Sequence, residues 1–395
     1  MPHTVPPKYI TEIMRTLELA GFRPYLVGGC VRDIFIGRRP NDWDMCSDAL
    51  PEEVAEIFLH TVPTGIKHGT VTVMHRGKGV EITTFRCDGG YIDHRRPESV
   101  SFTCELEEDL RRRDFTINAI AMASDGTITD PFGGRDDISR RLICCVGDPA
   151  ARFDEDALRM LRALRFKAQL GFELDEETLH AIWAKAPLAD GLSAERVRDE
   201  LQKLLCSSSP EDMQQMLDIG LLARFIRRGD ISGLNRISVL PKQPRLRWCA
   251  LCALLLRSGL IESCRSFLSG LRLDSSTIRL CEDGTDAVLS GISGDTAAIK
   301  HVIAKYGKPS AECACAAAEV ICGTGYLRSL RRIINSEECT SLAQLAVSGT
   351  DLTELGFRGK EIGKVLDALL DHVIYHPGDN RRDILLALAS ESACQ

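Results

Sequence analysis

The signals for β-strands are confined to the first ~145 residues of this 395-residue chain. Short runs such as "PYLVGG" and "NDWDMC" are typical of strands, and "TVTVMHRGKGVEITTF" is typical of a hairpin with a glycine turn. Helical patterns lie between them, at residues 8–21 and in "VRDIFIG", "LPEEVAEIFL" and "RRDFTINAIAMA". From residue 150 onward only helical patterns remain. The sequence therefore predicts an α+β fold, in which a head with a mixed sheet precedes an entirely helical remainder.

A chain of this length exceeds one compact core, so several domains are expected. The helical part is interrupted at "SSSP", "LPKQP", "SGISGD" and "HPGD", and no repeat of fixed period is visible. We divide the chain into a head, a helical neck, a helical body and a helical tail, at residues 1–149, 150–209, 210–320 and 321–395.

Composition indicates a protein of the cytoplasm. No apolar run approaches the ~18 residues of a membrane span, and "MPHTVPPKYI" lacks the apolar core of a signal peptide. We expect neither a membrane partner nor an obligate protein partner. The 16 cysteines are scattered in apolar runs, and the pair Cys249 and Cys252 has no second pair at zinc-site spacing. We interpret them as buried thiols in a reducing compartment.

The stretch "LVGGCVRD" combines a strand, two glycines and a helix start. Gly28 and Gly29 allow close approach of the backbone to a phosphate, and Arg32 could bind a phosphate oxygen. A plain turn with Arg32 on the surface is the alternative. The stretch is not GxGxxG, which disfavours a dinucleotide-binding oxidoreductase.

Two aspartates follow in "NDWDM". In a strand, Asp42 and Asp44 point to the same face, and they repel each other unless cations bind between them. A two-metal site uses this arrangement, and magnesium suits carboxylate and phosphate oxygens. Glu81, in "VEITTF", is the candidate for a third carboxylate on a neighbouring strand. The alternative is an ordinary solvated face.

Three arginines precede the predicted helix of "RRRDFTINAIAM". Arg113, beside a helix start, could hold a triphosphate. Asp114 is a candidate N-cap of that helix. Without other signals, a basic run of this kind is a solvated face.

The stretch "RFDEDALRMLRALRF", residues 152–166, predicts one amphipathic helix. It carries Asp156, Arg159, Arg162 and Arg165, each three residues after the last. Steps of three residues drift backward around a helix, so Arg165 should lie about half a turn from Asp156. One end of this row could then face a base, while the other faces phosphate or the head.

Asp156 and Arg159 together could select a base. A carboxylate only accepts hydrogen bonds and a guanidinium only donates them. Cytosine and adenine each present an amino donor beside a ring-nitrogen acceptor, whereas uracil and guanine present the reverse. Each good pairing of this kind discriminates by about 1–3 kcal/mol. The alternative is an intrahelical ion pair.

In order and spacing, "LVGGCVRD", "NDWDM", "TGIKHGTVTV", "RRRDFTINAIAM", "DPFGG" and "RFDEDALRMLRALRF" resemble the class II tRNA nucleotidyltransferase and bacterial poly(A) polymerase family. The resemblance covers about the first 205 residues strongly, and the tail "VSGTDLTELGFRGKEIGKVLDALLDHV" looks like the CCA-adding members. It implies a polymerase-beta-like head. It also implies that Asp42 and Asp44 hold Mg²⁺ and that the nucleoside triphosphate is bound by Gly29, Arg32, Arg113, Asp156, Arg159, Arg162 and Arg165.

The implied activity is template-independent addition of CCA to the 3′ end of tRNA from CTP and ATP, with release of pyrophosphate. A poly(A) polymerase, a CC-adding or an A-adding enzyme of the same family is the nearest alternative, and a non-catalytic RNA-binding protein a distant one. The long segment "CDGGYIDHRRPESVSFTCELEED" favours addition of both C and A. The neck, residues 150–209, is expected to recognise the nucleotide base, and the tail, residues 321–395, is expected to bind tRNA. The densest basic set of the tail is expected to contact tRNA phosphates; it comprises Arg358, Lys360, Lys364, Arg381 and Arg382.

Overall fold

A computed structural model describes the chain except for residues 1–4, 90, 93–95, 98–99, 324 and 394–395. The long segment that favours addition of both C and A therefore lies partly outside the described residues. The chain forms two compact units. One comprises residues 1–200 and 215–222, and the other comprises residues 201–214 and 223–395. The division into four parts stays a prediction, because each unit spans more than one of them.

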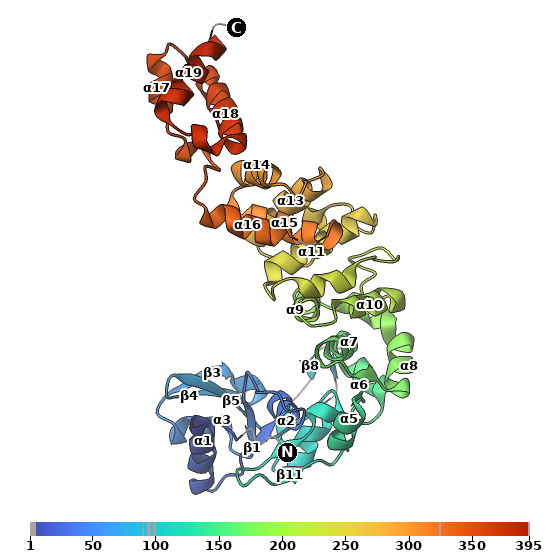
Figure 1. Ribbon diagram of the computed structural model, residues 1–395. Coiled ribbons are helices and arrows are strands. Elements are labelled where there is room, and N and C mark those ends of the chain that lie inside the picture. The colour runs from blue at the N-terminus through green and yellow to red at the C-terminus, as the bar shows by residue number, and fades with distance from the viewer. Residues whose placement is uncertain (1–4, 90, 93–95, 98–99, 324, 394–395) are drawn as a thin grey trace. The chain divides into compact units, whose positions relative to one another are not determined.

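The first unit is built on a seven-stranded mixed sheet, as predicted, with the order β11-β10-β1-β2-β5-β4-β3 (Figure 1). Its strands are β1 (Tyr25–Val27), β2 (Asp44–Ser47), β3 (Thr61–Gly65), β4 (Thr70–His75), β5 (Lys78–Thr84), β10 (Ala121–Met122) and β11 (Ile128–Thr129). Only β2 and β5 pair in parallel within this sheet; its other described pairs are antiparallel. Three two-stranded ladders accompany it: β6 (Arg86–Asp88) with β9 (Val100–Phe102), β7 (Tyr91–Ile92) with β8 (Arg96–Pro97), and β12 (Leu142–Ile143) with β13 (Glu173–Leu174).

The predicted hairpin is confirmed as β4 and β5. Its apolar side chains alternate along each strand, so that Val71 and Val73 on β4 and Val80 and Ile82 on β5 are buried. The helices of the head are α1 (Lys8–Leu19), α2 (Gly29–Phe35), α3 (Pro51–Ile57), α4 (Leu106–Arg111) and α5 (Gly134–Arg140). In the sheet, the end of β1 lies opposite the start of β2, and the start of β2 lies opposite the middle of β5.

The helix predicted for "RRRDFTINAIAM" is wrong. Helix α4 ends at Arg111, the first of the three arginines. A short 3₁₀ turn follows at Thr116–Asn118, and β10 begins at Ala121. Tertiary contacts override the local helical pattern, because β10 pairs with β1 and Phe115 bridges to Cys145.

The neck helices of this unit follow without long loops. They are α6 (Pro149–Glu155), α7 (Leu158–Leu170), α8 (Glu176–Lys185) and the start of α9 (Ala194–Leu205). The single helix predicted over residues 152–166 is wrong, because α6 ends before Asp156 and α7 begins after it. Asp156 has an extended backbone (φ −145°, ψ 101°), and its side chain accepts a hydrogen bond from the Leu158 N–H at 3.0 Å. Such local bonding competes with helix continuation.

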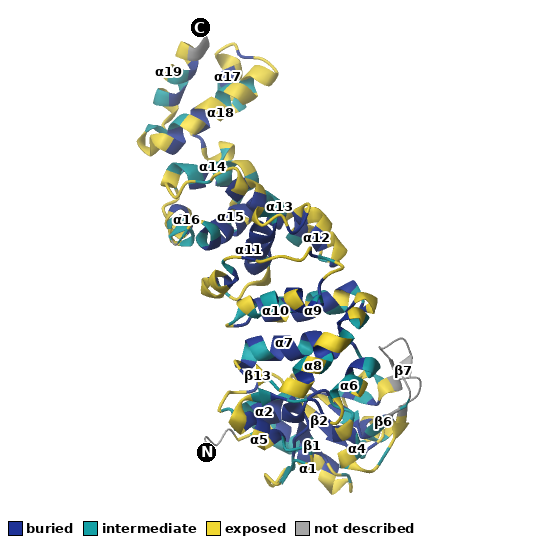
Figure 2. Ribbon diagram, turned by 90° about the vertical axis from the view of Figure 1, so that its right-hand side faces the viewer, coloured by how far each residue is buried: buried dark blue, intermediate teal, exposed yellow. Residues whose placement is uncertain are grey.

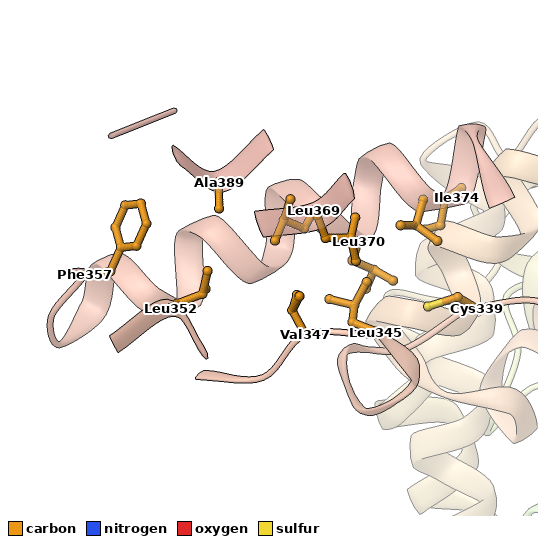
Figure 3. Close-up of a cluster of buried hydrophobic side chains, with 11 residues drawn as sticks. Cys339, Leu345, Val347, Leu352, Phe357, Leu369, Leu370, Ile374 and Ala389 are labelled. Carbon is orange, nitrogen blue, oxygen red and sulfur yellow. The ribbon is translucent and has the colours of Figure 1, made fainter. Parts of the chain in front are cut away.

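The second unit is helical, as predicted. Its later helices are α11 (Pro244–Arg257), α12 (Cys264–Gly270), α13 (Ser275–Leu289), α14 (Thr296–Tyr306), α15 (Lys308–Ile321), α16 (Tyr326–Asn335), α17 (Gly349–Glu354), α18 (Lys360–Tyr375) and α19 (Arg382–Ala393), and α10 (Met213–Ile219) lies at the boundary of the units. Helix α11 is buried along most of its length (Figure 2). A second core joins α17, α18 and α19 through residues such as Leu352, Leu369 and Ala389 (Figure 3). None of the described helices is long and apolar enough to span a membrane.

Candidate active site

The strand register brings the predicted carboxylates together. Asp44 opens β2, where it lies opposite Val27 of β1 and opposite Glu81 of the parallel strand β5. Residues in register on adjacent strands share a face, with strands ~4.8 Å apart. Asp44 and Glu81 are therefore neighbours on two central strands of the sheet, beside the glycines that follow β1.

Asp42 lies just before this strand and not within it, contrary to the prediction. It occupies an exposed bend, and buried Trp43 separates it from Asp44. The two carboxylates are nevertheless close enough to interact. Burial and the nearby charge of Glu81 raise the pKa of Asp44, Arg113 opposes this effect, and Asp42 adds to it. The site thus holds crowded negative charge that only partly finds a cation within the protein.

Gly28 lies close to both the Asp44 carboxylate and the Arg113 guanidinium. Gly28 has φ +73°, which favours glycine, and it has little room for a side chain. A Cβ atom there would lie 3.3 Å from Arg113 Nη1 and 3.9 Å from Asp44 Oδ2. The sequence-predicted Gly28, Asp44 and Arg113 therefore meet at one point.

Arg113 is oriented by an acidic residue that the motif did not single out. Its Nη2 donates to Asp109 Oδ2 at 3.1 Å, and Arg112 donates to the other oxygen of the same carboxylate. Burial alone would raise the pKa of Asp109, but Arg113 and Arg112 hold it below its usual value. Arg113 Nε is buried and has no hydrogen-bond partner among the described residues.

Arg32 points inward and does not lie on the surface as the plain-turn alternative requires. It is only 8% exposed, and it donates to Asn118 Oδ1 at 2.7 Å and to Asp33 Oδ1 at 2.8 Å. Gly29 lies close to this guanidinium, because a Cβ atom at Gly29 would lie 3.5 Å from Arg32 Nη2. The motif "GGCVRD" thus builds a fixed cation behind the glycine turn.

Asp114 connects this cation to the neck. Contrary to the prediction, Asp114 does not cap a helix. It accepts hydrogen bonds from the Phe115 N–H, from Asn118 Nδ2 at 3.1 Å and from Arg162 Nε at 2.8 Å. Burial opposes its ionisation, but Arg162 and these donors lower the pKa of Asp114 to about 2. Arg32, Asn118, Asp114 and Arg162 therefore form one continuous network.

In the neck, Asp156 and Arg159 do not form the pair on one helix that the sequence predicted. Asp156 Oδ2 accepts from Arg196 Nη2 at 2.7 Å, and Arg196 Nη1 is buried with no partner among the described residues. Arg159 is 7% exposed and binds Glu155 Oε2 at 2.5 Å and the Arg112 carbonyl at 2.9 Å. The two residues do not share one helix face, because Asp156 lies in the break between α6 and α7.

Arg165 faces the interior of the unit. Its Nε donates to Glu200 Oε2 at 2.8 Å, its Nη1 donates to Gln169 at 2.9 Å, and its guanidinium lies 3.5 Å from the Phe166 ring centroid. Glu200 also approaches Arg162 at 3.8 Å. These contacts pack Arg165 against the neck helices α7 and α9, and its predicted contact with phosphate or with the head stays a prediction.

Protein side chains alone do not complete a metal site. Within the part of the chain that the structure describes, no three His, Cys, Asp or Glu side chains converge closely enough to hold a metal ion, and the cysteines there are free. Magnesium, however, is usually bound through one or two carboxylates together with substrate phosphates. Asp42 and Asp44, with Glu81 beside them, are the donors that suit such a shared site.

Four site residues escaped the sequence analysis: Asp109, Asn118, Arg196 and Glu200. Asp109 had a local signal, because it precedes Arg113 by four residues on a helix. Asn118 lay inside a quoted motif without an assigned role. Arg196 and Glu200 are 40 and 35 residues from their partners, and nothing in the spacing indicated them.

Two known families match the chain. The family described as "Poly A polymerase head domain" matches residues 24–144, and "Probable RNA and SrmB- binding site of polymerase A" matches residues 171–228. Among full-length relatives, the CCA-adding enzyme of Geobacillus kaustophilus is 40% identical, over 96% of this chain and 95% of the relative. The CCA-adding enzyme of Geobacillus stearothermophilus is 38% identical, with the same coverage.

Solved structures agree with these relatives. The Bacillus stearothermophilus CCA-adding enzyme in complex with CTP is 35% identical and superposes with a TM-score of 0.85, over 99% of this chain and 98% of the other. The Thermotoga maritima CCA-adding enzyme complexed with tRNA_CCA, at 21% identity and a TM-score of 0.69 over 99% and 97% of the two chains, shows the same fold.

The Asp114 network yields a prediction about stability. Asp114→Asn keeps the size of the side chain and removes the charge that pairs with Arg162, so the free energy of unfolding at neutral pH should fall by about 2 kcal/mol. A lowered pKa stabilises the fold above the unfolded pKa of ~3.9, and this contribution disappears as the pH falls toward ~2. Urea unfolding of both proteins across this range measures the effect.

The control is Asp136→Asn, an exposed carboxylate in the first turn of α5, whose stability should hardly change. A difference between wild type and Asp114→Asn that stays constant from neutral to acidic pH would show that packing, and not charge, makes Asp114 important.

Proposed function

Because this chain belongs to the family of CCA-adding enzymes, which extend the 3′ end of tRNA with CTP and ATP, we propose that the carboxylate group of Asp42, Asp44 and Glu81 is its catalytic centre. In the reaction, the 3′-hydroxyl of tRNA attacks the α-phosphorus of the nucleotide and pyrophosphate leaves. The observation that carries this assignment is the register pair of Asp44 with Glu81 beside Gly28 and Arg113.

Nucleotidyltransferases of this family generally depend on divalent metal ions. We assign Asp42 and Asp44 as the residues that would hold Mg²⁺. When bound there, the metal supplies charge that favours ionisation of the attacking hydroxyl and stabilises the leaving pyrophosphate. The raised pKa of Asp44 supports the assignment, because crowded carboxylates gain from a cation and phosphate oxygens can complete its ligands.

The cations around the glycine turn would receive the triphosphate. Gly28 leaves the backbone accessible, and Arg113 and the Asp44 carboxylate both lie close to it. Asp109 fixes the orientation of Arg113, so its charge is already in place when the triphosphate arrives. Arg32 lies behind the turn and supports this wall through Asn118.

The neck would read the base. Asp156 offers an acceptor that suits the amino group of cytosine or adenine and repels the carbonyl oxygen of uracil or guanine. Arg159 remains its proposed donor partner, and Arg162 and Arg165 complete the pocket wall through Asp114 and Glu200. Arg196 is a positioning residue, because its hydrogen bond holds the Asp156 carboxylate.

The overall activity can be tested directly on tRNA that lacks its last three nucleotides. With purified protein, CTP alone should add C twice, CTP together with ATP should complete CCA, and ATP alone should add nothing. The products are sized on a denaturing gel. A long adenosine tail would indicate a poly(A) polymerase, arrest after CC would indicate a CC-adding enzyme, and no product would contradict enzymatic activity.

The metal-binding role of the paired aspartates has its own test. Asp42→Ala and Asp44→Ala should each lower kcat at least ~10³-fold, because the metal stabilises charge in the transition state. Binding of tRNA, measured by filter retention without nucleotide, should persist. Glu52→Ala, which removes an exposed carboxylate of α3, serves as the control and should remain active. Near-normal turnover of either aspartate variant would remove it from the mechanism.

Base selection should depend on Asp156. In Asp156→Ala, kcat/KM for CTP and ATP should fall while incorporation of UMP or GMP relative to CMP rises about tenfold, since the acceptor and the repulsion are lost together. Arg159→Ala should relax selection in the same direction. Arg165→Lys disturbs helix packing and should affect all four nucleotides alike.

The measurement is kcat/KM for each nucleotide on a matched tRNA primer. Arg196→Lys, which weakens the hold on Asp156 while keeping the charge, should show a milder loss of selection. Equal losses for all four nucleotides in Asp156→Ala would show that Asp156 only joins the neck helices.

A further inference from the structure

Helix α16 carries three exposed arginines on one face. Arg328, Arg331 and Arg332 are spaced three and four residues apart, so they form a stripe about 100° wide along the helix. The opposite face packs into the second unit through buried Leu330 and Ile333. The guanidiniums therefore point to solvent from a helix that is firmly anchored.

These three charges are uncompensated. Among the residues that the structure describes, none of the three makes a side-chain hydrogen bond or an ion pair. Two acids on segments that flank the helix are engaged elsewhere: the Glu319 carboxylate accepts the N–H groups of Gly325 and Leu327, and Glu338 pairs with Lys300.

Helix stability does not account for the arrangement. Like charges three or four residues apart on a helix repel each other and destabilise it. The helix dipole favours a cation only in the last turn, which accounts for Arg332 but not for Arg328 in the first turn. A polyanion that binds along the stripe would attract all three guanidiniums and offset the repulsion between them.

The basic tail residues expected from the sequence are different. Arg381 pairs with Asp383, Arg382 pairs with Asp351, and Arg358 donates to the Thr353 carbonyl at 3.4 Å. Of that set, Lys360 and Lys364 on α18 have no ion-pair partner among the described residues. The α16 stripe is therefore a stronger candidate for phosphate contact than most of the tail set, and it lies outside the RNA-binding family match at residues 171–228.

We propose that the α16 stripe, in the second unit, is a binding surface for the phosphate backbone of the tRNA substrate. Arginine suits this partner, because its planar guanidinium donates two hydrogen bonds to one phosphate. Contacts to phosphate carry no sequence information, so the stripe would add affinity for any tRNA and orient it by shape. The inference rests on the proposed function, because that function supplies tRNA as the polyanion.

The test neutralises the stripe with R328Q, R331Q and R332Q together in the full chain. Binding of tRNA lacking CCA is titrated without nucleotide, at several salt concentrations. Each lost phosphate contact reduces the slope of log K against log salt by about 0.7–0.9, so the triple variant should lose about two units of slope or more and bind roughly tenfold more weakly at low salt. The KM for tRNA should rise, and the KM for CTP should not.

The matched control is R245Q with R265Q, two arginines of the same unit that are already paired with Glu312 and Glu282 and that lie outside the RNA-binding family match. It should keep the wild-type salt slope. The arginine-to-lysine triple variant should also keep the slope while binding less tightly. If circular dichroism shows that the glutamine triple variant is misfolded, R331Q alone should still lower the slope by about one unit.

An unchanged salt slope in a folded glutamine variant would overturn the proposal. An equal loss of slope in the control variant would also overturn it, because the effect would then come from the net charge of the unit and not from the α16 stripe. Failure here differs from failure of the proposed function, because nucleotide addition by the wild-type protein is measured separately on the same tRNA.

Discussion

The ion pair between Asp114 and Arg162 is the interaction on which the catalytic half of the molecule depends. It joins the segment that follows α4 to the neck helix α7, and through Asn118 it also orients Arg32 behind the glycine turn. A buried carboxylate is costly unless its oxygens are satisfied, and the partners of Asp114 include a guanidinium, an amide and a backbone N–H. One side chain thus fixes two cations whose positions matter to the site.

Around this pair, neck arginines also bind the end of a head helix. Arg152 donates to the Arg111 carbonyl at 3.2 Å, and Arg159 donates to the Arg112 carbonyl at 2.9 Å. The last carbonyls of a helix lack partners within it, and guanidiniums are well placed to satisfy them. Arg152 and Arg159 therefore hold the neck against the run that carries Arg113.

The second unit uses the same chemistry for a purely structural purpose. Arg247 is 1% exposed and donates to the carbonyls of Leu205, Ser207, Ser238, Leu240 and Pro241. Burial lowers the pKa of Arg247. Because carbonyls from two segments, residues 205–207 and 238–241, meet at this guanidinium, it ties both segments to α11. Arg247 of α11 is thus buried in the second unit, whereas the three arginines of α16 are exposed to solvent.

The sequence by itself determined the class of fold, the hairpin and the acidic motif, because strands, turns and glycines with positive φ depend on local chemistry. The residue-by-residue role of Asp42 and Asp44 remains a proposal, and so does the assignment of Mg²⁺. Local patterns failed at "RRRDFTINAIAM" and at Asp156, where strand pairing and a side-chain hydrogen bond outweighed helical periodicity. Only the tertiary structure could bring Arg196 to Asp156 and Glu200 to Arg165, or show which arginines are paired and which are not. Those contacts depend on how distant helices pack, and no spacing along the chain encodes that.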